Sequence, residues 1–122
     1  MINQGTLLRV IDNSGARFAL CIKVLHKIPT GCAHLGEKVI IVVKVAKPHK
    51  KVKKGQIHTA LIVRNSRQVY RKEGSYIKFD AAACVILKKD GMPLANYILG
   101  PVSKELRKMG HVKIISLSSI AL

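Results

Sequence analysis

Residues 38–46 read KVIIVVKVA, and six of these nine residues are valine or isoleucine. Side chains branched at the β-carbon pack well on a pleated surface, so such a run favours a β-strand. The purely apolar part, residues 39–43, is far shorter than the roughly 20 residues that a membrane-spanning helix needs. We therefore predict a central strand that ends before Pro48.

The segment before this strand predicts a β-hairpin. Residues 6–11 and 17–25 are both rich in apolar side chains, and the sequence between them is DNSG at positions 12–15. These four residues all favour turns, and we assign Asn13, Ser14 and Gly15 to the turn itself. In the second segment one face would carry Phe18, Leu20, Ile22 and Val24, and the other would carry Ala19, Cys21 and Lys23. This alternation predicts a strand with one buried face.

Shorter strand-like segments follow the central one at residues 57–63, 75–79 and 84–87. Loops are indicated at residues 29–31 and 89–91. Five or six strands without room for crossover helices predict a mostly β fold and a small antiparallel barrel. Closing the sheet into a barrel would leave no exposed strand edges.

A short C-terminal helical region is the last predicted element. Gly100-Pro101 is expected to end the preceding regular structure. Ser103 is a candidate N-cap, and Gly110 suits the position after the helix. Between them Leu106 and Met109 share a helical face, and residues 112–117 form an apolar tail. We expect residues 1–122 to form a single domain.

The charge balance indicates the class of partner. Twenty-two Lys and Arg residues stand against six acids, which leaves a net charge of +16. Such a domain repels itself, and a polyanion that supplies counter-charge relieves the repulsion. Nucleic acid is the expected partner. A membrane surface is not expected, because the sequence shows no basic amphipathic helix that would bind one. Three cysteines at unrelated spacings do not form a disulfide framework, which fits a reducing compartment.

Two basic segments are the candidate RNA-binding sites. Lysine holds a phosphate as a flexible point charge, and arginine can hold a phosphate through two parallel hydrogen bonds. The first segment contains Lys47, His49, Lys50, Lys51, Lys53 and Lys54. The second contains Arg64, Arg67, Arg71 and Lys72. The alternatives are a solvated charged loop for the first segment and an ion pair between Arg64 and Asp80 in the second.

Aromatic residues are few, and Phe18 and Phe79 are expected in the core. Proteins that stack bases on a sheet generally present two or more exposed rings, so the composition favours recognition of folded RNA through its backbone and shape.

The sequence offers no catalytic constellation. It contains neither a GxGxxG nor a Walker motif, the six acids are scattered singly, and the flanks of Ser14 do not fit a nucleophile elbow. Cys32-x-His34, with Cys21, His26 or Cys84, matches no zinc-module spacing. We therefore expect no enzyme activity, metal, cofactor or small-molecule substrate.

Over essentially its full length the sequence resembles the universal large-subunit ribosomal protein family numbered fourteen. The matching segments are Asp12-Asn13-Ser14-Gly15-Ala16, Cys21-Ile22-Lys23-Val24, Lys44, Ala46, Pro48, Lys51-Val52-Lys53-Lys54-Gly55, Ala60, Val63-Arg64, Phe79-Asp80, Ala83-Cys84-Val85, Gly100-Pro101-Val102, Glu105-Leu106-Arg107 and Lys113-Ile114-Ile115-Ser116-Leu117.

The resemblance implies a five-stranded barrel that is a structural constituent of the large ribosomal subunit, contributes to its assembly and has no catalytic activity. It also implies binding to large-subunit ribosomal RNA, a bridge to small-subunit ribosomal RNA at the subunit interface, and neighbouring large-subunit proteins numbered three and nineteen. The basic loop of the family corresponds by position to residues 47–54.

The chain departs from the family pattern at several positions. Glu73-Gly74 replaces the usual Asp-Gly or Asn-Gly turn, Ala82 replaces an asparagine, and Ser118-Ser119-Ile120 replaces Ala-Pro-Glu. Ala95-Asn96-Tyr97 replaces Gly-Thr-Arg, so the assembly or silencing factor that relatives bind there is not carried over.

The excess of Lys and Ile and the lack of a presequence indicate an organelle-encoded copy in the mitochondrion, with bacterial cytoplasm or plastid as alternatives. A free RNA chaperone or transcription-associated barrel is the rival class.

Overall fold

The computed structural model describes residues 2–25 and 31–122. The predicted loop residues Pro29 and Thr30, and the metal candidate His26, lie outside this range. The elements in chain order are β1 (Leu7–Val10), β2 (Ala16–Val24), β3 (Lys38–Ala46), β4 (Ile57–Arg64), β5 (Val69–Tyr70), β6 (Tyr76–Ile77), β7 (Ala83–Leu87), β8 (Ile98–Val102), α1 (Glu105–Lys108), α2 (Val112–Leu117) and β9 (Ser118–Ala121).

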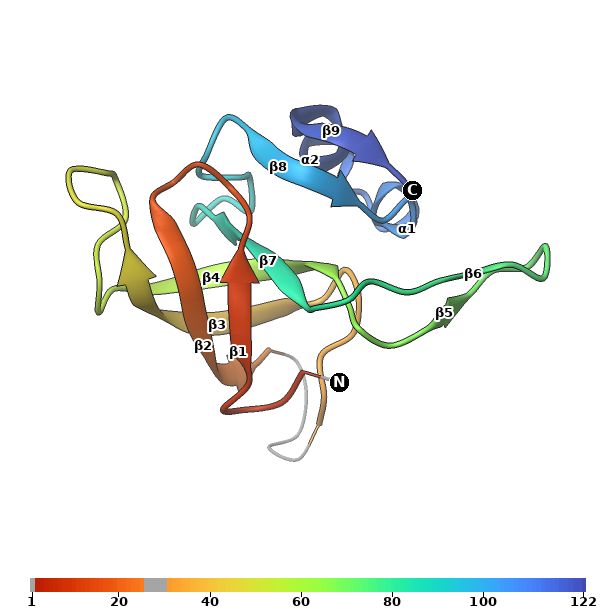
Figure 1. Ribbon diagram of the computed structural model, residues 1–122, viewed down its shortest axis with the longest axis horizontal. Helices are drawn as coiled ribbons and strands as arrows, with labels where there is room; N and C mark the ends of the chain where they lie inside the picture. The colour runs from red at the N-terminus through yellow and green to blue at the C-terminus, as the bar shows by residue number, and fades with distance from the viewer. Residues whose placement is uncertain (1, 26–30) are drawn as a thin grey trace.

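The predicted five-stranded barrel is confirmed. Strands β1, β2, β3, β4 and β7 close in that order, with β3 between β2 and β4 (Figure 1). The β1–β2 hairpin is antiparallel, with Leu7 opposite Leu20. The closing pair β1–β7 is parallel, so the sheet is not antiparallel throughout. The reason is geometric, because an odd number of alternating strands brings the first and last together in the same direction.

The buried face of β2 differs from the prediction. Ala19 and Cys21 are fully buried in the barrel, whereas Phe18, Leu20 and Ile22 are only half-buried. Few side chains fit inside a narrow barrel, so small residues occupy the interior face. A register shift between Cys21 and Lys23 changes the parity further along the strand.

Strands β4 and β7 are buried on both faces, which divides the core into two clusters. Inside the barrel Ile62 and Ile86 pack with the interior residues of β2 and β3. On the outside Leu61, Val63 and Val85 pack against a layer formed by β8, α1 and α2. These C-terminal elements gather over one side of the barrel (Figure 1).

The C-terminal helical region is shorter and differently capped than predicted. Helix α1 begins after Lys104 and has no side-chain cap, because the Ser103 hydroxyl donates instead to the Glu105 carboxylate. Leu106 is buried as expected, but Met109 is half exposed. The apolar tail at 112–117 is helix α2, which is followed by β9 in parallel pairing with β8.

The predicted strand at residues 75–79 lies outside the barrel. Only Tyr76–Ile77 is extended, as β6, and it pairs with β5 in a two-stranded ribbon. This ribbon projects from the barrel as an arm (Figure 1). We call residues 66–79 the arm. No helix in the described part of the chain has the length and apolar character needed to cross a membrane.

Candidate nucleic-acid interface

The basic loop, residues 47–54, is held against the turn of the β1–β2 hairpin. The main-chain N–H of Lys47 donates to the carbonyl of Gly15 at 2.8 Å, and that of Val52 donates to Ser14 at 3.2 Å. The Val52 side chain is fully buried in the interior cluster. The loop is therefore fastened at its start and near its end, although most of its side chains are exposed.

Gly15 permits this close packing. Its φ is +113°, and a β-carbon placed there would lie 2.3 Å from the Cβ of Lys50. Only glycine avoids both the conformational strain and the collision. The turn role predicted for Gly15 therefore includes a second function, which is to leave space for the basic loop.

The lysine and histidine side chains of the basic loop are exposed on this fastened backbone. They are Lys47, His49, Lys50, Lys51, Lys53 and Lys54. His49 has φ +62°, an uncommon conformation for a residue with a side chain. The end of the loop is tied by Gly55 N–H to the Val43 carbonyl at 2.8 Å. The loop thus presents a dense positive surface on a defined backbone.

Asp12, which the sequence indicated only as a turn former, organises this region from within. Its buried carboxylate accepts hydrogen bonds from the Ser14 hydroxyl at 2.5 Å and the Ser14 N–H at 3.2 Å. Its second oxygen accepts from the N–H of Ile86 in β7 at 2.9 Å. Burial raises the pKa of Asp12 above its usual value, although these hydrogen bonds oppose the rise.

A cleft of about 920 Å³ opens beside the basic loop, between the β1–β2 turn and β8. Among the residues that the structure describes, five cationic side chains line it: Arg9, Arg17, Lys47, Lys50 and Arg64. Asp12 is the one acid among these described lining residues, and its carboxylate is already hydrogen-bonded. Sequence reasoning missed Arg9 and Arg17, because each stands alone in a strand and only barrel closure brings them together.

Arg64 fastens the C-terminal layer to the barrel at the edge of this cleft. Its Nε donates to the Pro101 carbonyl at 2.7 Å, and its Nη2 donates to that of Leu99 at 2.8 Å. These carbonyls, rather than the Asp80 considered from the sequence, are the partners that the structure shows. Burial, and then the nearby charge of Arg9, lower the pKa of Arg64. Both side chains line the cleft, so their like charges repel each other there.

Phe18 and Phe79, expected in the core, are half-buried and belong to neither buried cluster. Phe79 lies beneath Arg64, whose guanidinium carbon is 6.0 Å from the ring centre.

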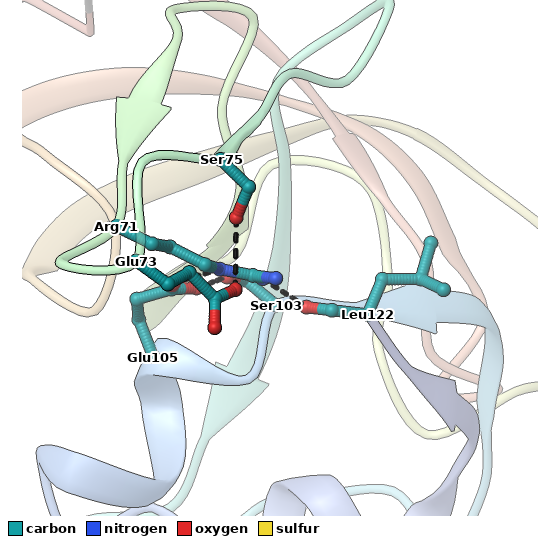
Figure 2. Close-up of polar contacts among 6 residues, drawn as sticks. All are labelled: Arg71, Glu73, Ser75, Ser103, Glu105 and Leu122. Carbon is teal, nitrogen blue, oxygen red and sulfur yellow. Dashed lines mark hydrogen bonds and ion pairs between the residues drawn. The ribbon is translucent and has the colours of Figure 1, made fainter.

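Arg71 also has partners within the chain (Figure 2). Its Nε donates to the Glu105 carboxylate at 2.7 Å, and its Nη2 donates to the main-chain oxygen of Leu122 at 2.5 Å. Partial burial would raise the pKa of Glu105, but hydrogen bonds from Arg71 and Ser103 outweigh it and lower this pKa. Arg71 therefore joins the arm to α1 and to Leu122, the residue that follows β9.

The two basic segments do not form one surface. The basic loop and the arm project from opposite ends of the molecule along its longest axis (Figure 1). In the second segment Arg64 lies at the cleft, and Arg67 and Lys72 are exposed on the arm. The positive charge of these two segments is thus divided between a loop with its adjacent cleft and a separate arm.

The cysteines are free thiols at separate places. Cys21 and Cys84 are buried and Cys32 is half-buried. Within residues 2–25 and 31–122, no three His, Cys, Asp or Glu side chains are grouped so that they could hold a metal ion.

A closed β-barrel with a fastened basic loop and a cation-lined cleft defines a small basic barrel protein of the kind suited to a polyanion. The family model described as Ribosomal protein L14p/L23e matches residues 1–122, the whole chain. The chain belongs to this family, whose members are structural proteins of the large ribosomal subunit.

Proposed function

We propose that this protein binds large-subunit ribosomal RNA through the basic loop and the adjacent cleft. The observation that carries the proposal is the convergence of Arg9, Arg17 and Arg64 with two loop lysines around one cleft. Neutralising phosphates releases condensed counterions and supplies much of the affinity of a basic protein for nucleic acid.

The repulsion between Arg9 and Arg64 supports this assignment. A phosphate placed between the two guanidinium groups would replace that repulsion with two attractions. Arg64 is already oriented by its bonds to Leu99 and Pro101, so little side-chain freedom remains to be lost on binding.

The fastened loop supports a scaffolding mechanism. Hydrogen bonds from Lys47 and Val52 to the hairpin turn hold the loop backbone, so its lysines meet RNA with little loss of backbone freedom. In this mechanism the barrel fixes the positions of RNA segments during subunit assembly and carries out no catalysis. Arg67, Lys72 and the ion-paired Arg71 make the second RNA contact, from the arm.

We extend the proposal to the place of the protein in the ribosome. Family membership supports a position at the subunit interface, where the protein bridges to small-subunit ribosomal RNA and lies beside the large-subunit proteins numbered three and nineteen. Exposed apolar side chains at Leu99 and Ile120, on the paired strands β8 and β9, support a protein contact there.

For the compartment we propose the mitochondrial ribosome, on the basis of the high Lys and Ile content. Immunoblotting of purified mitochondria, cytosol and plastids tests this assignment. Enrichment outside the mitochondrial fraction would contradict it without affecting RNA binding.

The function is tested by sedimenting a native lysate through sucrose at low and at high salt. Co-migration with the large subunit and the whole ribosome at both salt concentrations is the expected result. Recovery near the top of the gradient would contradict the proposal and favour the rival class, a free RNA-binding barrel that exchanges between RNAs.

A further inference from the structure

We propose that Tyr70 and Tyr76 form a stacking site for an unpaired RNA base on the outer face of the arm. The inference rests on the proposed RNA-binding function, which it deepens by naming the chemical group that the arm recognises. In the sequence, the scarcity of aromatic residues argued against such a site. The pairing of these two rings appears only in the folded ribbon.

The ribbon of β5 and β6 has two different faces. Val69 is opposite Ile77, and both are half-buried, whereas Tyr70 is opposite Tyr76 and both are exposed. The exposed fractions of the two tyrosines are 74% and 57%. Strand alternation therefore directs the aliphatic pair inward and the aromatic pair outward.

The two rings are arranged so that their faces remain accessible. Their centroids are 6.0 Å apart and their planes are inclined by 53°, so the two rings are not stacked face to face on each other. The hydroxyl of Tyr70 donates to Gln68 at 2.8 Å, which leaves the ring itself as the free part of that side chain. An aromatic face of this kind stacks on any nucleobase.

The surrounding charge favours RNA over a protein as the partner. Arg67, Lys72 and Lys78 are exposed on the arm, and Glu73 is the single acid among residues 66–79. The Glu73 carboxylate accepts a hydrogen bond from Ser75 at 2.8 Å (Figure 2). Phosphates flanking a stacked base could therefore meet three exposed cations on the same arm.

The Arg71 contacts hold this site in place. A two-stranded ribbon is marginally stable by itself, but the bonds from Arg71 to Glu105 and Leu122 attach it to the C-terminal layer. The rings are thus presented on a supported strand pair. Because bases within a duplex are already stacked on each other, the base that the site accepts belongs to a single-stranded loop, bulge or end.

Tyrosine fluorescence offers a direct test, because the chain contains three tyrosines and no tryptophan. In a Tyr97→Phe background only Tyr70 and Tyr76 emit. We expect a short single-stranded oligoadenylate to quench this emission and a blunt RNA duplex to leave it unchanged. Changing both residues to leucine should weaken oligoadenylate binding by about tenfold or more and leave duplex binding unchanged. Changing both to phenylalanine should preserve the affinity, since stacking requires the ring and not the hydroxyl.

The remaining outcomes separate this inference from the function on which it rests. Equal oligoadenylate affinity for the parent and the double leucine variant, with duplex still bound, would overturn the stacking site and leave RNA binding intact. The same result, together with loss of the leucine variant from large-subunit particles, would assign the tyrosines to a protein partner. Failure of the parent protein to bind any RNA would overturn both proposals.

Discussion

The carboxylate of Asp12 accepts a hydrogen bond from the main-chain N–H of Ile86, 74 residues further along the chain. The other oxygen of the same carboxylate binds Ser14 through both its N–H and its hydroxyl. One buried side chain therefore joins β7 to the hairpin turn, and the turn in turn holds the basic loop. The shape of the proposed RNA-binding surface depends on this internal contact.

Replacing Asp12 with asparagine should destabilise the protein. In either orientation of the amide, one N–H of Ser14 or Ile86 would face the NH₂ group, and an unsatisfied buried donor costs about 1–3 kcal/mol. Chemical denaturation of the parent and the Asp12→Asn variant at neutral pH measures the difference. Equal free energies of unfolding would contradict the role given to this carboxylate.

The stability difference between these proteins should also depend on pH. Because burial raises the pKa of Asp12 above its usual 3.8, the folded state binds the proton more tightly than the unfolded state. The contribution of this linkage is fully present below the unfolded pKa and is lost as the pH rises through the folded pKa. The free energy of unfolding of the parent minus that of Asp12→Asn should therefore decrease with rising pH, and a flat difference would contradict the raised pKa.

Gly15→Ala should disturb the basic loop as well as the hairpin turn. The new methyl group would collide with Lys50 at a backbone φ of +113°, whereas Gly55→Ala adds a methyl group at φ +88° with nothing within 4 Å. We expect Gly15→Ala to cost about 1–3 kcal/mol more than Gly55→Ala in denaturation experiments, since strain is common to both but collision is not. Equal losses would show that the loop moves aside freely.

Changing Lys50, Lys51, Lys53 and Lys54 together to glutamine should lower RNA affinity and reduce its salt dependence. Each lost phosphate contact should flatten the slope of log affinity against log salt by about 0.9 unit. Binding titrations with a ribosomal RNA fragment at several salt concentrations measure this slope. In the control variant four exposed lysines outside the loop are changed to glutamine, so that the loss of charge is the same. They are Lys88, Lys89, Lys104 and Lys108. Equal slopes for the loop variant and the parent would exclude phosphate contacts by these lysines.

The three cysteines should differ sharply in reactivity. Burial raises the pKa of the Cys84 thiol, with Asp12 and Cys21 adding to the effect, and burial also raises that of Cys21. Since the thiolate is the reactive form, a disulfide reagent should modify Cys32 rapidly and the other two only on unfolding. Absorbance measurements with and without denaturant count the thiols, and Cys32→Ser should remove the rapid phase. A rapid phase that persists in this variant would contradict the burial of the other two.

The sequence by itself determined the class of fold and the expected partner. The β-branched run at residues 38–46, the turn residues after β1 and the net charge of +16 are local or summed properties, readable without coordinates. The basic loop could be located for the same reason, since its lysines are adjacent in the chain. Alternation predicted the strands, but it did not reveal which face of β2 lies inside, because a register shift is a property of strand pairing.

Tertiary structure alone decided which distant residues act together. Barrel closure brings Arg9, Arg17 and Arg64 to one cleft, and ribbon pairing places Tyr70 opposite Tyr76 on an outward face. It also gave Arg71 a partner in Glu105, which a count of positive charges could not anticipate. The physical reason is that charge and β-propensity are carried by single residues, whereas contacts, burial and shared surfaces arise only when strands far apart in the chain are paired.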